Sequence, residues 1–158
     1  VQSEYSLWTR DPEAYVLEAC RDLGIGFVPF SPMGRAILTG TIKDGDSISS
    51  KGDMRSTMPR FQGENLNKNL SLVEELSKLA TTKGCSSGQL GLAWLLAKGD
   101  FISPIPGTKH VKYLEENAAA INISLSVDEL SELDKIFSPG NVAGERYTSS
   151  GMASLDRD

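Results

Sequence analysis

Residues 101–117 of this chain read FISPIPGTKHVKYLEEN. The run from Phe101 to Ile105 is short and partly β-branched, which predicts a buried strand end rather than a helix. Pro106 and Gly107 then break the chain, and the side-chain oxygen of Thr108 is placed to cap a following helix. The apolar positions of that helix predict one buried face, made of Val111, Leu114, Ala118 and Ile121.

A strand that runs directly into a helix N-terminus is a natural seat for a phosphate group. The N–H groups of the first helical turn and the positive end of the helix dipole point at one place. Lys109, His110 and Lys112 surround that place with cationic or polar side chains in an otherwise acidic protein. The alternative is an ordinary strand–turn–helix connection, and these residues alone leave both interpretations open.

Length and charge narrow the class of protein. The 158 residues suit a single domain with a hydrophobic core. A net charge of −5 argues against nucleic acid or an anionic membrane as the partner, and no apolar run approaches the ~18 residues of a membrane span. Cys20 and Cys85 lack metal-binding spacing and indicate reduced thiols, hence a cytoplasmic location. The start at Val1, without Met and in strand-like sequence, suggests a fragment or a processed product.

The remaining chain alternates between strand and helix patterns. Strands are predicted at 1–6 and 26–30, and helices after Asp11, from Glu64, after Ser86 and after Ser126, the last two with capping boxes. The predicted buried helix faces are Val16, Leu17, Cys20 and Leu23; Leu66, Leu70, Val73, Leu76 and Ala80; Leu90, Ala93, Trp94 and Ala97; and Leu130, Leu133 and Ile136. The alternation predicts a parallel sheet with right-handed crossovers in one α/β domain over 1–158.

Two segments carry no regular pattern. Residues 41–63 are polar, with several Ser, Gly and Asp, and predict a long loop that is either a functional lid or disordered. Residues 139–158 predict an irregular tail. The chain has no G-x-G-x-x-G after a strand and no Walker A lysine. His110 is the single histidine and has no nearby Cys or His, so neither a metal site nor a Ser/His/Asp triad is expected.

Four stretches, in order, resemble the C-terminal half of an aldo-keto reductase of the NADP-dependent branch: VQSEYSLWTRDPE, GIGFVPFSPMGRAILTG, MPRFQGEN and PIPGTKHVKYLEENAAAI. That family is a (β/α)8 TIM barrel that reduces aldehydes and ketones by hydride transfer from NADPH. The resemblance implies that the strands at Val1, at Gly26–Phe30 and at Phe101–Ile105 are strands 6 to 8 of a partial barrel. The segment after Ser126 would be a C-terminal extra helix.

The resemblance also assigns cofactor-binding roles near the nicotinamide and the pyrophosphate. Gln2 would hold the nicotinamide carboxamide, and Phe30 would stack on the nicotinamide ring, although core packing is the plain alternative for Phe30. Arg60 would close over the cofactor from the long loop. The turn residues that would contact the pyrophosphate are Ser31, Met33, Gly34 and Arg35.

At the other end of the cofactor, the opening stretch would hold the adenosine. Tyr113 would lie beside the ribose and adenine, with Glu116 and Asn117 at the adenine amine. The residues around the 2′-phosphate would be Gly107, Thr108 and Lys109. A lysine beside helix N–H groups suits a dianionic phosphate, which favours NADP(H) over NAD(H). The alternative for Lys109 is a solvated surface side chain.

The catalytic Asp, Tyr, Lys and His of the family lie on the first half of its barrel. His110 does not stand in the context of the catalytic histidine, nor do the tyrosines in that of the catalytic tyrosine: Tyr5, Tyr15, Tyr113 and Tyr147. Without a general acid to protonate the alkoxide, the chain alone is expected not to reduce carbonyl compounds.

Three functions remain open at this point. The first is the cofactor-binding half of a reductase whose small-molecule carbonyl substrate binds once the missing half is supplied. The second is a non-catalytic NADPH-binding or regulatory module, and the third is an inactive truncated product. A three-stranded parallel sheet leaves two unpaired edges, so we also expect self-association through these edges or dependence on the missing half.

Overall fold

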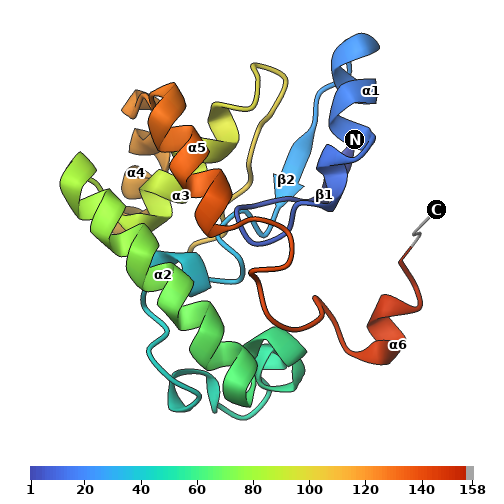
Figure 1. Cartoon of the computed structure of the whole chain (residues 1–158), viewed down its shortest axis with the longest axis vertical. Helices are drawn as coiled ribbons and strands as arrows, with labels where there is room; N and C mark the ends of the chain where they lie inside the picture. The colour runs from blue at the N-terminus through green and yellow to red at the C-terminus, as the bar shows by residue number, and fades with distance from the viewer. Residues whose placement is uncertain (156–158) are drawn as a thin grey trace.

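The computed structural model describes residues 1–155, and its sheet is small and parallel. Strands β1 (Gln2–Glu4) and β2 (Val28–Phe30) pair in parallel, with Gln2 opposite Val28 and Glu4 opposite Phe30. Segment 101–105 lies along the other edge of β2, where Phe27 bridges Ile102 and the Ile105 N–H donates to the Pro29 carbonyl. The three predicted strand regions therefore lie side by side (Figure 1), although the third forms a single bridge and Ile105 is exposed rather than buried.

The described helices are α1 (Val16–Asp22), α2 (Gly63–Lys83), α3 (Ser87–Leu96), α4 (Val111–Ala119), α5 (Val127–Ile136) and α6 (Ser149–Met152). Short 3₁₀ turns join them: η1 (Asp11–Glu13), η2 (Ile37–Thr39), η3 (Asp46–Ile48), η4 (Met54–Thr57), η5 (Pro59–Phe61) and η6 (Ala120–Asn122). Within residues 1–155, no helix combines the length and the apolar character needed to cross a bilayer.

Helix α3 is the centre of the packing. It lies against α2, α4, η2 and η6 (Figure 1) and is buried around almost its whole circumference. A helix enclosed on all sides needs no polar face, which explains its continuous apolar sequence. Burial of Leu90, Ala93 and Trp94 confirms that part of the prediction, but Ala97 is exposed because it follows the last turn of the helix.

Local capping chemistry sets the helix ends as predicted. Ser86 with Gln89, and Ser126 with Glu129, form complete capping boxes in which each serine hydroxyl accepts the N3 N–H and the N3 side chain accepts the N-cap N–H. Gly84 ends α2 in the left-handed conformation at φ 74°. The apolar stripe of α2 faces the core, with Leu70 only partly buried, and α5 buries Leu133 most completely.

The first helix differs from its prediction. Asp11 starts the 3₁₀ turn η1 without a side-chain cap, and the α-helix begins again at Val16. Leu17 and Cys20 are buried as expected, but Leu23 is exposed. Leu23 is the C-cap residue of the helix, so it lies beyond the turns that contact the sheet.

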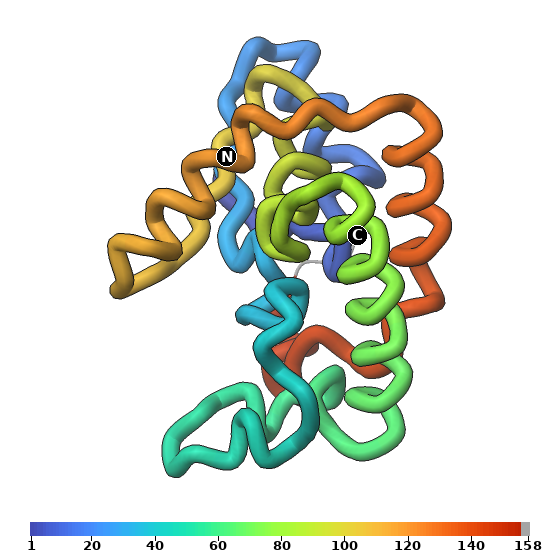
Figure 2. Tube along the Cα trace, turned by 90° about the vertical axis from the view of Figure 1, so that its left-hand side faces the viewer, coloured from blue at the N-terminus to red at the C-terminus, as the bar shows by residue number. Residues whose placement is uncertain are grey.

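The predictions for α4 are wrong in two respects. The helix has His110 as its N-cap, without a side-chain cap, while the Thr108 hydroxyl accepts the His110 N–H at 3.2 Å. The stripe predicted to be buried is exposed: Val111 is 71% exposed, Leu114 58% and Ile121 76%, and Ala118 is exposed too. Helix α4 projects from the side of the molecule (Figure 2, orange, left), so no described element covers this face.

The long polar segment 41–63 is folded against the core rather than disordered. It contains η3, η4 and η5 and no strand, which agrees with a loop. Its few apolar side chains anchor it, because all of them except Met54 are buried: Ile42, Ile48, Met58 and Phe61. A lid role for this segment stays a prediction.

The tail 139–158 is irregular as predicted, except for the single turn of α6, which was not predicted. Residues 156–158 of this predicted tail lie outside the described residues. Asn69 holds the tail to α2, since its amide donates to the Ala143 carbonyl at 2.9 Å and its amide oxygen accepts the Ala143 N–H at 2.8 Å. Arg60 Nε donates to the Gly144 carbonyl at 3.2 Å. The tail is thus fixed by side chains distant in sequence.

Candidate functional site

A strained turn follows β2. Ser31, Arg35 and Ala36 have φ of 48°, 56° and 76°, the left-handed region that non-glycine residues rarely adopt. Gly34 shares it at 57°, and a Cβ atom there would lie 3.2 Å from both Trp8 Cε3 and Ile37 Cγ2. Each such non-glycine residue costs of order 1–3 kcal/mol, and strain of this kind concentrates at ligand sites. The sequence pattern did not indicate this strain.

The second part of the site lies where segment 101–105 meets α4. Gly107, Thr108 and Lys109 are all exposed at this corner, and Lys109 forms no ion pair with any described residue. The Tyr113 ring is half exposed and meets the His110 ring edge-on, with centroids 5.7 Å apart. The corner therefore offers a free cation, a helix N-terminus and an accessible aromatic ring.

The inner end of α4 is docked on the start of α3. Ser86 Oγ donates to the Glu116 carboxylate at 2.5 Å, and Gln89 Nε2 donates to the Glu116 carbonyl at 3.0 Å. The neighbouring Asn117 buries its Nδ2 atom without a hydrogen-bond partner among the described residues. A buried amide donor that lacks a partner is a destabilising feature in the absence of a ligand.

The first turn of α3 joins the two parts. The Met33 sulfur would lie 3.3 Å from a Cβ atom on Gly88, and Ser86 contacts Glu116. Phe30 is half-buried at the end of β2, and Gln2 is exposed on β1. The structure thus brings Met33 of the turn and Glu116 of α4 to the same end of α3, its N-terminus. Gln2 and Phe30 lie on the paired strands β1 and β2.

Two predicted cofactor residues are engaged inside the protein. Arg35 forms a bidentate pair with Glu4 at 2.9 and 2.7 Å, and Tyr147 Oη donates to Glu4 Oε2 at 3.0 Å. Arg60 Nη1 donates to the Trp8 carbonyl and the Thr9 hydroxyl, at 3.0 and 2.8 Å. Burial lowers the pKa of Arg60 to about 10. The cofactor contacts of these two arginines stay predictions.

Sequence reasoning missed the partners of these arginines. Glu4 is 1% exposed at the carboxyl end of β1, where the Thr9 and Tyr147 hydroxyls donate to its carboxylate. Asn69 on α2 donates to the Arg60 carbonyl and also holds the tail. Of these partners, Glu4 is the one that the sequence could have indicated, because a carboxylate inside a predicted buried strand requires a cation. Asn69 gave no signal, since polar residues are ordinary on an amphipathic helix.

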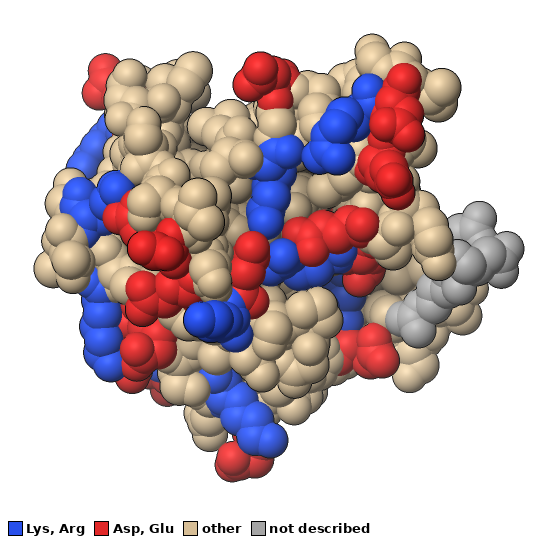
Figure 3. Space-filling model, turned by 45° about the horizontal axis from the view of Figure 1, so that its top comes forward, with Lys and Arg blue, Asp and Glu red and all other residues tan. Residues whose placement is uncertain are grey.

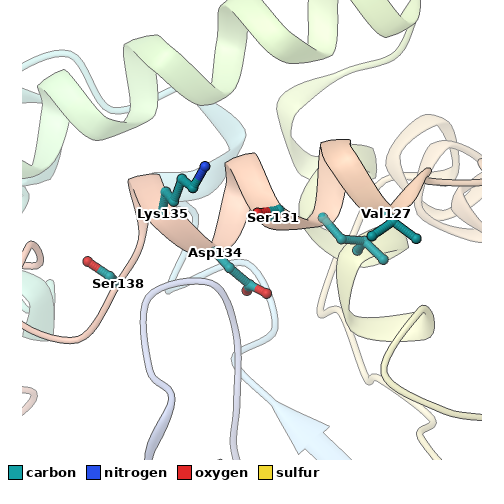
Figure 4. Close-up of a pocket in the computed structure, with 6 residues that line it drawn as sticks. Val127, Ser131, Asp134, Lys135 and Ser138 are labelled. Carbon is teal, nitrogen blue, oxygen red and sulfur yellow. The ribbon is translucent and has the colours of Figure 1, made fainter.

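Other surface hollows lie away from α4 and the turn after β2. One of about 560 Å³ lies on α5, where Val127, Ser131, Asp134 and Lys135 are spread along the helix and Ser138 lies on the loop that follows it (Figure 4). Within residues 1–155, no group of three His, Cys, Asp or Glu side chains is placed to hold a metal ion. On the face in Figure 3, basic and acidic side chains interleave without forming a continuous basic patch.

Comparison with known proteins identifies the family to which the chain is similar. The Aldo/keto reductase family model matches residues 1–138. A curated relative, aldo-keto reductase yakc (NADP(+)) of Schizosaccharomyces pombe, is 47% identical over 150 residues, which cover 93% of this chain and 44% of the relative. The glycerol dehydrogenase AKR11B4 from Gluconobacter oxydans superposes with a TM-score of 0.76 at 25% identity, over 87% of this chain and 41% of its own.

An aldo/keto reductase from Klebsiella pneumoniae, solved in complex with NADP and acetate, superposes with a TM-score of 0.62 over 93% of this chain and 42% of its own. At 23% identity that likeness concerns the fold alone. This chain spans less than half the length of these relatives. The family and its solved members imply a (β/α)8 barrel, of which the described residues form a part, in agreement with the resemblance. Since the match covers most of the sequence, the chain belongs to the aldo/keto reductase family.

Proposed function

We propose that this chain binds NADP(H) across the carboxyl ends of β2 and segment 101–105. It thereby supplies the cofactor-binding half, strands 6 to 8, of a barrel that reduces aldehydes and ketones. The observation that carries the proposal is the strained turn at Ser31, Arg35 and Ala36, which holds backbone groups at the end of β2 at a cost to folding. The name of the yakc relative, which includes NADP(+), supports the cofactor.

The residues at α4 fit the adenosine end of this cofactor. The exposed Lys109 and the N-terminus of α4, which has no side-chain cap, suit a 2′-phosphate. The Tyr113 ring offers a flat face for adenine, and the Asn117 amide gains the partner that it lacks. Gln2 and Phe30 would hold and orient the nicotinamide, and bound NADPH supplies the hydride.

Two of the four tyrosines, Tyr5 and Tyr147, are unsuited to serve as the proton donor. Tyr5 is fully buried, and its hydroxyl donates to Glu13 at 2.6 Å. Burial raises the pKa of Tyr5 and, less strongly, that of Tyr147, which opposes the acidity that a general acid needs at neutral pH. In this proposal turnover requires the catalytic groups of the other barrel half.

Replacing Lys109 with Ala is expected to weaken NADPH binding by about 10- to 100-fold, because a charge-assisted contact to the 2′-phosphate is lost. NADH lacks this phosphate, so its dissociation constant should stay within about twofold, given that surface substitutions are nearly neutral. Quenching of tryptophan fluorescence during titration of the purified chain with each cofactor measures both constants. Lys68→Ala, an exposed lysine on α2, is the matched control.

Equal loss of NADPH and NADH affinity in Lys109→Ala would contradict a 2′-phosphate seat at α4. If the wild-type chain binds neither cofactor and unfolds without a cooperative transition, the third function, an inactive product, is favoured instead. If it binds NADPH and the supplied barrel half restores no turnover, the non-catalytic module is favoured.

A specific observation favours the module as the second candidate function. The apolar face formed by Val111 and Leu114 of α4 and Ile121 of η6 is exposed, as is usual for a surface that meets a partner. Together with the open edges of the parallel segments, it supports the proposal that the chain self-associates.

Replacing Leu114 with Glu should therefore reduce self-association at least tenfold, because a charge cannot be buried without a partner. Sedimentation velocity across a concentration series measures this, with Glu115→Gln on the same helix as control. A wild-type chain that sediments as a compact monomer at all concentrations would contradict self-association.

A further inference from the structure

The strained turn after β2 is held by segments that are distant from it in sequence. Ser31, Arg35 and Ala36 of this turn have left-handed backbone conformations. Non-glycine residues keep such a conformation only where the surrounding structure fixes it. The turn meets its supports through Arg35, because both the side chain and the carbonyl oxygen of this residue bond to other parts of the chain.

The Arg35 side chain is part of a closed ring of hydrogen bonds. Its Nη1 and Nη2 atoms donate to the two carboxylate oxygens of Glu4 at 2.9 and 2.7 Å. Nη2 also donates to Tyr147 Oη at 3.0 Å, and that hydroxyl donates to Glu4 Oε2 at 3.0 Å. We call the side chains of Glu4, Arg35 and Tyr147 the clasp. It joins the turn to β1 and to the C-terminal tail.

Tyr147 is the contribution of the tail to the clasp. Its ring centroid lies 5.1 Å from the Cζ atom of Arg35 and 5.1 Å from that of Arg146. The tail is anchored four residues earlier, where Asn69 bonds to both backbone groups of Ala143. The Tyr147 hydroxyl is therefore held against the turn from two sides, by its own ring contacts and by the anchor on α2.

The long segment 41–63 supports the same turn from its backbone side. Arg55 on η4 donates from Nη1 to the Arg35 carbonyl at 3.2 Å. Asp53 orients this arginine, since its carboxylate accepts from Nε at 2.9 Å and from Nη2 at 2.6 Å. The Arg55 side chain is 25% exposed, so its contact to the turn is removable without opening the core.

We propose that Tyr147 is a positioning residue for cofactor binding, which acts through Glu4 and Arg35 to keep the turn 31–36 in the shape that receives the pyrophosphate. The inference rests on the proposed function. Apparent affinity falls in proportion to the fraction of protein in the binding conformation. Loss of the Tyr147 hydroxyl therefore weakens every ligand that needs the turn, and Arg35 acts behind the turn rather than on the cofactor.

Tyr147→Phe tests the proposal, because it removes the hydroxyl and keeps the ring. Isothermal titration of the full chain uses NADPH, NADH and adenosine 2′-monophosphate, which has the 2′-phosphate and no pyrophosphate. We expect NADPH and NADH to bind about five- to tenfold more weakly, by the same factor. Adenosine 2′-monophosphate should stay within about twofold. Tyr15→Phe, the same change at a residue that is 73% exposed, is the matched control.

Two further variants separate positioning of the turn from a general structural role. Ala36 has φ of 76°, which glycine adopts without a steric cost. Adding Ala36→Gly to Tyr147→Phe should therefore recover about threefold of the lost affinity for both cofactors. Arg55→Gln, which leaves the clasp intact, should weaken both cofactors about threefold, because it removes the support on the backbone side.

Urea midpoints followed by circular dichroism give the folded fraction at which the affinities are compared. A folded Tyr147→Phe chain that binds both cofactors like the wild type, or that loses affinity for NADPH alone, overturns this inference. Lys109→Ala is the variant expected to affect NADPH alone. If the wild-type chain binds neither cofactor, the proposed function fails and this inference fails with it. A wild-type chain that binds NADPH beside an unaffected Tyr147→Phe chain overturns this inference only.

Discussion

Glu4→Gln is expected to lower the free energy of unfolding by about 3–5 kcal/mol, because removing one partner of a buried ion pair leaves the other uncompensated. Glu4 is 1% exposed and accepts both hydrogen bonds of the Arg35 fork, one from Tyr147 and one from Thr9. Gln keeps the shape of the side chain but places a donor amide where an acceptor is required. The guanidinium group of Arg35 then remains buried without an anion.

Urea unfolding followed by circular dichroism measures this loss. Glu74→Gln, an exposed carboxylate on α2, is the matched control and should change stability by less than about 0.5 kcal/mol. The double variant Glu4→Leu with Arg35→Met should recover part of the loss, because an apolar pair of similar volume needs no counter-charge. A Glu4→Gln loss below about 1 kcal/mol would show that water reaches the cluster and compensates the charge.

The elements that the sequence predicted well are those set by near neighbours. Both capping boxes use residues three apart, and the α2 stripe repeats at helical spacing, so the physical cause lies within a few residues. The parallel order of the strand regions followed from their alternation with helices. The strands are short, because within the described residues each of them pairs with few neighbouring strands.

The exposed face of α4 shows what periodicity cannot supply. The spacing of Val111, Leu114 and Ile121 correctly identifies a side that favours apolar surroundings, but it does not identify what covers that side. Helix α4 instead contacts α3 through Glu116, a position that the stripe did not include, and the following turn η6 also packs against α3. The prediction failed for the packing of the helix, not for its existence.

For a related reason, the side-chain partners of the candidate-site arginines could not be predicted from local sequence patterns. Arg35 pairs with Glu4 across 31 residues and with Tyr147 across 112, and Arg60 reaches Gly144 across 84. Such pairings depend on how the folded chain brings distant segments together, and the spacing of residues in the sequence does not indicate this. The positive φ of Ser31 and Ala36 was equally hidden, because the residues there are not glycine.

Trp94→Ala is expected to cost about 3–5 kcal/mol of unfolding free energy, the range for truncating a buried large aromatic side chain. Trp94 is fully buried near the C-terminal end of α3, and its ring centroid lies 5.3 Å from that of Tyr5, next to β1. Its Nε1 atom donates to Asp134 on α5 at 3.0 Å. Lys98 Nζ lies 4.3 Å from the ring centroid. The truncation therefore loosens β1, α3 and α5 together.

Trp94→Phe separates the two contributions, because it keeps an aromatic ring and removes the indole donor; we expect it to cost about 1–3 kcal/mol. Leu23→Ala, at an exposed position, should stay within about 0.5 kcal/mol of the wild type. Urea midpoints from circular dichroism order the three variants. Equal stability of Trp94→Ala and the wild type would mean that α3 is not the centre of the core.

The same variant separates stability from cofactor binding. The first turn of α3 joins the β2 turn to α4, but Trp94 itself lies far along the helix from Ser86 and Gly88. Trp94→Ala should therefore weaken the apparent NADPH affinity only in proportion to its unfolded fraction, and added NADPH should raise its urea midpoint as it raises that of the wild type. Lys109→Ala should show the opposite pattern, with normal stability and lost NADPH affinity. A Trp94→Ala chain that stays folded yet loses NADPH affinity would instead place part of the cofactor site within the core packing of α3.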